Sequence, residues 1–115
     1  MSRPKRGEIW LVALDPTIGR EIRKTRPAVV ISNDINNQYS GTVTVIPVTS
    51  SLKKTYPFEV YLPEGEGGLE HDSKARTDQI RTVDVRRLIR CLGSLSRARI
   101  REIEQALAIH LDLEL

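Results

Sequence analysis

Hydrophobic residues in this chain fall into short runs that polar and turn-forming residues interrupt, and this pattern predicts β-strands. The expected strands span residues 8–14, 28–32, 42–49, 58–62, 73–81 and 90–95. The run at 58–62 alternates, which predicts that Phe58, Val60 and Leu62 face the core while Glu59 and Tyr61 face solvent.

Three other segments have different patterns. Residues 34–40 predict one helical turn with Asn33 or Asp34 as its cap, and residues 16–25 carry many charges without a period, which indicates a mobile loop. Near the end of the chain Ser96 can cap a helix, because the apolar residues that follow it fall at helical spacing: Ile100, Ile103, Leu107 and Leu111.

Several short strands followed by one helix predict a mainly β fold, in which a curled antiparallel sheet or small barrel packs against the C-terminal helix. No repeat, linker or low-complexity tract interrupts the sequence, so we expect a single domain over residues 1–115. A chain of this length can form one modest core.

The composition narrows the class of protein without identifying it. Lys and Arg total 18 against 15 Asp and Glu, and this net charge of +3 is too small to indicate a polyanionic partner.

The single cysteine, Cys91, excludes an internal disulfide and a multi-cysteine zinc site, and its apolar neighbours predict a buried or half-buried strand position. No apolar run could cross a bilayer and no signal peptide is evident, so we expect a cytoplasmic protein without a membrane partner.

The most informative candidate chemistry lies at the ends of two predicted strands. Arg26 precedes the strand at 28–32, and Thr49 with Ser50 and Ser51 closes the strand at 42–49. If these strands are antiparallel neighbours, Arg26 and Thr49 share one end of the sheet, where a guanidinium and hydroxyl groups can bind a phosphate. From local sequence alone, Arg26 is equally a loop arginine in a surface ion pair, and Thr49 an ordinary strand residue.

Histidine and metal chemistry are weaker hypotheses. Glu70, His71 and Asp72 resemble a metal-ligand cluster, but neighbours on a strand alternate between faces. His110 falls near the C-terminal end of the predicted helix, where the helix dipole favours a cation. We therefore expect no metal, no cofactor and no catalytic histidine.

A series of short motifs runs in order through nearly the whole chain. They are residues 6–10 (RGEIW), 19–21 (GRE), 26–34 (RPAVVISND), 49–50 (TS), 72–73 (DS), 78–84 (DQIRTVD) and 87–88 (RL). This series resembles the MazF/PemK family of bacterial toxins, which are sequence-specific mRNA endoribonucleases. The resemblance implies an SH3-like small barrel of the MazF/CcdB toxin type, a homodimer, and metal-independent cleavage of single-stranded RNA. It also implies a cognate antitoxin, which we expect to be an acidic, partly disordered chain.

The resemblance assigns roles to individual residues. It places the family's catalytic arginine on Arg26, its catalytic threonine on Thr49 and its loop glutamate on Glu21. Glu21 could accept the proton of the RNA 2′-OH, or it could simply pair with Arg20 or Arg23. The residues expected to bind RNA are Arg20, Arg23, Lys24, Ser50, Ser51, Asp78 and Gln79. Where the family often has glycines before the Arg-Pro pair, this chain has Arg23-Lys24-Thr25.

Two other classes of function compete with the endoribonuclease. CcdB-type toxins share the fold and inhibit a protein target, gyrase, without catalysis, so the fold alone does not distinguish them. A plain nucleic-acid-binding module is the third hypothesis. Arg26 with Thr49 and the series at residues 78–84 favour the first class over the second. The few and scattered aromatic residues give little support to the third.

Overall fold

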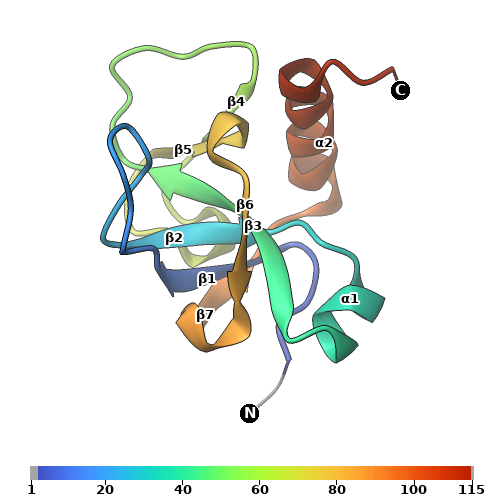
Figure 1. Ribbon diagram of the computed structural model, residues 1–115. Helices are drawn as coiled ribbons and strands as arrows, with labels where there is room; N and C mark the ends of the chain where they lie inside the picture. Colours follow the sequence, from blue (N-terminus) through green and yellow to red (C-terminus); the bar gives the residue numbers. More distant parts are fainter. Residues whose placement is uncertain (1–2, 115) are drawn as a thin grey trace.

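The computed structural model describes residues 3–114, which form a seven-stranded antiparallel sheet and a C-terminal helix that stands against it (Figure 1). The strands are β1 (Glu8–Ala13), β2 (Thr25–Val30), β3 (Thr42–Thr49), β4 (Glu59–Leu62), β5 (Ser73–Arg76), β6 (Arg81–Asp84) and β7 (Leu88–Ser94). The helices are α1 (Asp34–Tyr39) and α2 (Arg97–Leu111), with short 3-10 turns η1 (Glu66–Gly68), η2 (Thr77–Gln79) and η3 (Val85–Arg87).

The sheet has the order β4-β5-β3-β2-β1-β7, and β6 also pairs with β3. β5 and β6 thus share one edge of β3, with β6 along residues 42–45 and β5 at residues 48–49. The prediction of a mainly β fold with a C-terminal helix is confirmed. The sheet is curled but not closed, because β4 and β7 each pair on one side only.

The prediction of one strand over residues 73–81 was wrong. The chain leaves the sheet at η2 and returns as β6, which sequence reasoning missed. The cause is Thr77, which is fully buried and donates its hydroxyl hydrogen bond to the Phe58 carbonyl oxygen. This contact turns the backbone out of the ladder and lets the two halves pair with different parts of β3.

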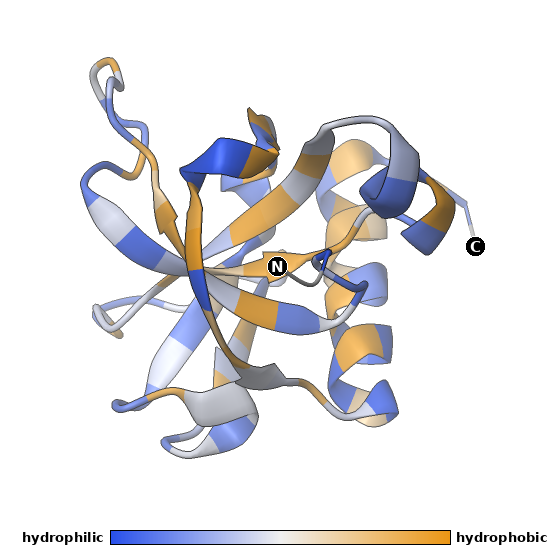
Figure 2. Cartoon of the chain, turned by 90° about the horizontal axis from the view of Figure 1, so that it is seen from below, coloured by the Kyte–Doolittle hydropathy of each residue, from blue (hydrophilic) through white to orange (hydrophobic). Residues whose placement is uncertain are grey.

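Two hydrophobic cores lie on the two faces of the sheet. Alternation along β2 sends Val29 into the core beneath α2, while Ala28 and Val30 enter the core on the opposite face with Trp10 and Val12. Figure 2 shows apolar and polar bands alternating along α2, as expected for a helix with one buried side.

Side-chain capping fixes where both helices begin. Asn33 accepts a hydrogen bond from the Asn36 N–H at 2.8 Å, and Ser96 accepts one from the Arg99 N–H at 3.3 Å, so Asn33 rather than Asp34 caps α1. The buried side of α2 includes Ile103, as predicted. Leu111, also predicted to be buried, is 46 % exposed.

Two other burial predictions were wrong. Cys91 is exposed, because β7 pairs only with β1 and forms an edge of the open sheet. Glu59, expected to face solvent, has a side chain only 1 % exposed. Its burial is possible because Lys74 and Arg76 on the neighbouring strand β5 supply opposite charges at 3.1 and 3.3 Å.

Glu59→Ala should destabilise the protein by about 3–5 kcal/mol, because it leaves Lys74, whose side chain is 8 % exposed, buried without an opposite charge. Urea unfolding followed by circular dichroism measures this change. The control is Glu64→Ala, which removes an exposed carboxylate from the following loop and should change stability by less than about 0.5 kcal/mol. Equal stability of the two variants would contradict the importance of the buried carboxylate.

Candidate functional site

The register between β2 and β3 decides which side chains meet at the end of the sheet. The paired residues are Ala28 with Pro47, Val29 with Ile46 and Val30 with Val45. Continued for two more residues, this antiparallel register would place Arg26 opposite Thr49. The two strands are therefore neighbours in the orientation that the sequence analysis required, and both residues project on the same face.

The backbone of Arg26 is fixed in the sheet, while most of its guanidinium group can still bind a ligand. β2 begins at Thr25, three residues earlier than predicted, and Arg26 pairs with Val12 of β1. Its Nε donates to the Arg23 carbonyl oxygen at 3.2 Å. Arg26 makes no ion pair within residues 3–114, so its two terminal nitrogens remain available to an anion.

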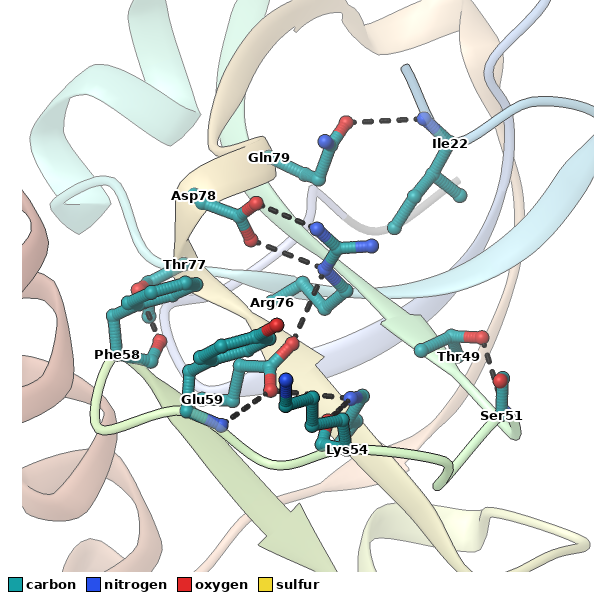
Figure 3. Close-up of polar contacts among 12 residues, drawn as sticks. Ile22, Thr49, Ser51, Lys54, Phe58, Glu59, Arg76, Thr77, Asp78 and Gln79 are labelled. Carbon is teal, nitrogen blue, oxygen red and sulfur yellow. Dashed lines mark hydrogen bonds and ion pairs between the residues drawn. The ribbon is translucent and has the colours of Figure 1, made fainter. Parts of the chain in front are cut away.

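The Thr49 hydroxyl is oriented by the turn that follows it. Its oxygen accepts a hydrogen bond from the Ser51 N–H at 3.2 Å, which leaves the hydroxyl hydrogen free to be donated (Figure 3). Ser50 and Ser51 are exposed beside it. On the other side of β3, Thr49 pairs with Lys74 of β5.

The loop after Ser51 is fastened by the charged cluster around Glu59. Lys74 donates its ammonium hydrogen bonds to the Lys54 carbonyl oxygen and to Glu59 Oε1, and the same carboxylate oxygen accepts from the Tyr56 N–H at 2.8 Å (Figure 3). Two points of the loop backbone are thus bound to the two partners of one buried ion pair. This attachment limits where the hydroxyl-bearing turn can lie.

The β1–β2 loop carries the basic residues Arg20, Arg23 and Lys24, all exposed. Lys24 adopts a left-handed backbone conformation (φ 71°), which glycine adopts more easily, and its carbonyl oxygen accepts from the Leu14 N–H at 2.9 Å. The loop was predicted to be mobile, but within it the Thr17 hydroxyl donates to Asp15. That hydrogen bond lowers the pKa of the Asp15 carboxyl below its ordinary value.

Glu21 does not pair with Arg20 or Arg23. Its Oε1 accepts a hydrogen bond from the Ile18 N–H at 3.1 Å, and its Oε2 lies 3.9 Å from Arg81 Nη1 of β6. The carboxylate is about half exposed, so it remains accessible from solvent.

Asp78 and Gln79 position other groups in this structure. Asp78 accepts two hydrogen bonds from Arg76, at 3.1 and 2.6 Å, which raises the pKa of that guanidinium above its ordinary value. The Gln79 side-chain oxygen accepts from the Ile22 N–H at 3.0 Å (Figure 3). Its side-chain nitrogen donates to the Arg20 carbonyl oxygen at 3.5 Å. Gln79 therefore attaches the basic loop to η2.

A cleft of about 320 Å³ opens at the same strand ends. It is lined by Leu11, Thr25, Arg26, Pro27, Val48, Ser50, Gly68, Leu69, Glu70, His71, Ser73, Arg90 and Leu92. Thr49 is not part of the lining, because alternation along β3 sends it to the face opposite Val48 and Ser50. Sequence reasoning missed Thr25 and Arg90, since only the strand order brings β7 and β2 to one cleft.

Glu70, His71 and Asp72 do not assemble a metal site. Within residues 3–114 no group of three or more His, Cys, Asp or Glu side chains is placed to hold a metal ion. The Asp72 carboxylate instead accepts from the Glu64 N–H at 2.8 Å. In the same part of the chain, neither helix has the length and apolar character needed to span a membrane.

Comparison with known proteins matches residues 5–111 to the family of PemK-like, MazF-like toxins of type II toxin–antitoxin systems. The chain is 46 % identical over 114 residues to Endoribonuclease MazF9 of Mycobacterium tuberculosis, covering 95 % of this chain and 97 % of that protein. The crystal structure of MazF from Deinococcus radiodurans superposes with a TM-score of 0.87 at 30 % identity, over 98 % of this chain and 100 % of that one. A mycobacterial endoribonuclease in complex with its cognate antitoxin has the same fold, with a TM-score of 0.81 at 24 % identity over 97 % and 98 % of the two chains.

Gln79→Ala should loosen the basic loop without unfolding the protein. The Ile22 amide loses its hydrogen-bond acceptor, so its hydrogen exchange should accelerate by about three- to tenfold, as expected for one hydrogen bond. Amide exchange followed by NMR measures the effect. Gln79→Glu keeps the acceptor oxygen and should retain the protection, and identical exchange in all three proteins would show that Gln79 does not hold the loop.

Proposed function

The chain belongs to the PemK/MazF family of type II toxin–antitoxin toxins, and we propose that it is a sequence-specific endoribonuclease that cleaves single-stranded mRNA. The proposal rests on Arg26 and Thr49 lying at the same end of the paired strands β2 and β3, and on the terminal guanidinium nitrogens of Arg26, which no residue in 3–114 occupies. A planar guanidinium beside a hydroxyl donor is suited to bind a phosphate group of the RNA backbone.

The reaction needs neither a protein nucleophile nor a metal. The 2′-oxygen of the RNA forms a bond to the adjacent phosphorus while the bond from phosphorus to the 5′-oxygen breaks, giving a 2′,3′-cyclic phosphate and a 5′-hydroxyl. One proton leaves the 2′-oxygen and one is delivered to the departing 5′-oxygen. The protein must therefore stabilise charge on the phosphate and move two protons.

Arg26 and Thr49 suit the first task. Arg26 remains protonated, so its role is electrostatic stabilisation of the nonbridging oxygens as charge accumulates in the transition state. Thr49 donates its hydroxyl hydrogen to one of these oxygens, while its own oxygen accepts from the Ser51 N–H. Ser50 and Ser51 offer further donors at the same strand end.

Glu21 is our candidate for the group that accepts the 2′-hydroxyl proton. It lies on the loop that leads into Arg26, and its outer oxygen is 3.9 Å from Arg81, too far for a short hydrogen bond that would occupy it. The exposed basic residues of this loop, Arg20, Arg23 and Lys24, supply positive charge along the path of the RNA backbone. Asp78 and Gln79 act on RNA indirectly in this proposal, through Arg76 and the loop backbone.

We place this single toxin domain in the cytoplasm, where mRNA is found, with an antitoxin as its protein partner. Related chains have been crystallised as MazE–MazF complexes, and a solved structure of one mycobacterial relative contains its cognate antitoxin. The partner we expect is an acidic chain that folds across the basic loop.

A homodimer would cover an apolar surface that the single chain leaves open. Ile35 and Tyr39 project from one side of α1, four residues apart, and each is 76 % exposed. Tyr39→Glu should shift the protein from dimer to monomer in light scattering after size exclusion. Ile109→Glu, which changes an exposed apolar residue of α2, is the control and should remain dimeric. A wild-type monomer would contradict the proposal.

Arg26→Ala should reduce cleavage about 10²–10³-fold, as expected for the loss of a preorganised charge donor. Its fold should persist, because the guanidinium makes no ion pair within residues 3–114. Single-turnover cleavage of a labelled RNA measures the rate, and urea unfolding checks the fold. Arg97→Ala, an exposed change at the start of α2, should cleave like the wild type. Near-normal cleavage by folded Arg26→Ala protein would remove Arg26 from the site.

Replacing the ribose at the cleavage site with deoxyribose should block cutting while leaving binding largely intact, because the nucleophile is then missing. Products of the unmodified RNA should carry a 2′,3′-cyclic phosphate and a 5′-hydroxyl, and EDTA should not change the rate. Mass spectrometry of the fragments identifies the ends. Cleavage of the deoxy-substituted RNA, or 5′-phosphate ends, would exclude this mechanism.

A further inference from the structure

The cleft beside Arg26 has a floor built by one row of residues across four strands. Leu11 of β1 pairs with Arg90 of β7 on one side and with Pro27 of β2 on the other. The β2–β3 register then brings Pro27 opposite Val48. Residues opposite each other on neighbouring strands share a face, so the row forms a largely apolar surface that ends in the charged group of Arg90.

The wall of the cleft is fixed by close backbone contact. A Cβ atom on Gly93 would lie 2.7 Å from the carbonyl carbon of Gly67, and one on Gly68 would overlap the Leu92 carbonyl group. Glycine at these positions lets η1 lie directly on β7. Leu69 is consequently buried at the base of the wall.

Two polar side chains stand at the cleft beyond this wall. Glu70 and His71 follow Leu69 directly, and the His71 carbonyl oxygen accepts a hydrogen bond from the Ser73 hydroxyl at 2.7 Å, which anchors the segment to β5. Glu70 and His71 therefore line the same cleft as Arg90.

Arg90 is exposed and makes no ion pair with any residue in 3–114. Its donors are therefore available to a ligand. At about 320 Å³ the cleft is in the size range of sites for small organic groups. An apolar floor with hydrogen-bonding groups at its edge suits a flat heterocycle whose rim carries acceptors and donors.

We propose that this cleft binds one nucleobase of the RNA, next to the phosphate that is cut, and that Arg90 reads its edge. The proposal rests on the proposed endoribonuclease function. Arg26 connects the two sites, because it lines the cleft and also stands opposite Thr49. Thr25 and Ser50, the sequence neighbours of Arg26 and Thr49, also line the cleft.

The test begins with the cleavage sites of the wild-type protein on a long RNA, located by sequencing the 5′-hydroxyl ends. In Arg90→Ala the preference at one position flanking the cut should weaken, and kcat/KM on a synthetic RNA of the best sequence should fall about ten- to a hundredfold. Arg101→Ala, an exposed change on α2 outside the cleft, should leave both preference and rate unchanged.

A second arm removes the base instead of the arginine. An abasic nucleotide at the affected position should slow the wild type by a similar factor but slow Arg90→Ala little further, because both changes delete the same interaction. If the abasic nucleotide and the Arg90→Ala substitution each lower the cleavage rate by a separate factor and the two factors multiply, the proposal is wrong. It is also wrong if Arg90→Ala keeps the wild-type preference at every position. An Arg90→Ala protein that cleaves normally but binds its antitoxin more weakly would assign the cleft to that protein instead. Absence of any cleavage by the wild type would refute the proposed function itself.

Discussion

The antiparallel register of β2 on β3 is the constraint on which the candidate site depends. Helix α1 separates the strands of Arg26 and Thr49 in sequence, and backbone hydrogen bonds between β2 and β3 bring the two residues to the same end of the sheet. A shift by a single residue would send one of the pair to the other face of the sheet. Burial on both faces prevents such a shift, since Val29 and Val30 belong to different cores.

The buried Glu59 cluster is a second constraint, and it acts on the connecting loop. A carboxylate that is almost fully removed from water is tolerated because β5 supplies two cations and the loop supplies a backbone N–H. The same ion pairs therefore join β4 to β5 and fasten the segment that follows Thr49. Stability of the fold and placement of the hydroxyl groups depend here on one group of charges.

Local pattern predicted the β-rich architecture and both helix caps, and it placed Arg26 and Thr49 at the ends of two strands that are antiparallel neighbours in the sheet. It failed where tertiary contacts override local preference. The alternating pattern of residues 58–62 predicts that Glu59 faces solvent. The cationic side chains of Lys74 and Arg76, on a strand distant in sequence, allow it to be buried. Thr77 looks like a strand residue until its hydrogen bond to Phe58 breaks the strand. The contribution of Arg90 to the cleft follows from strand order, which periodicity does not encode.

Alternation at the end of β2 and β3 has an evolutionary consequence. Alternation sends the side chain of Thr49 away from the cleft, whereas Thr25 and Ser50 line it, and Arg26 also borders it. Mutations at the cleft residues other than Arg26 leave the Arg26 and Thr49 side chains in place. Proteins with this fold can therefore evolve a different ligand preference in the cleft while selection keeps the arginine and the threonine. Paralogues in one genome can then recognise different targets and still catalyse the same reaction.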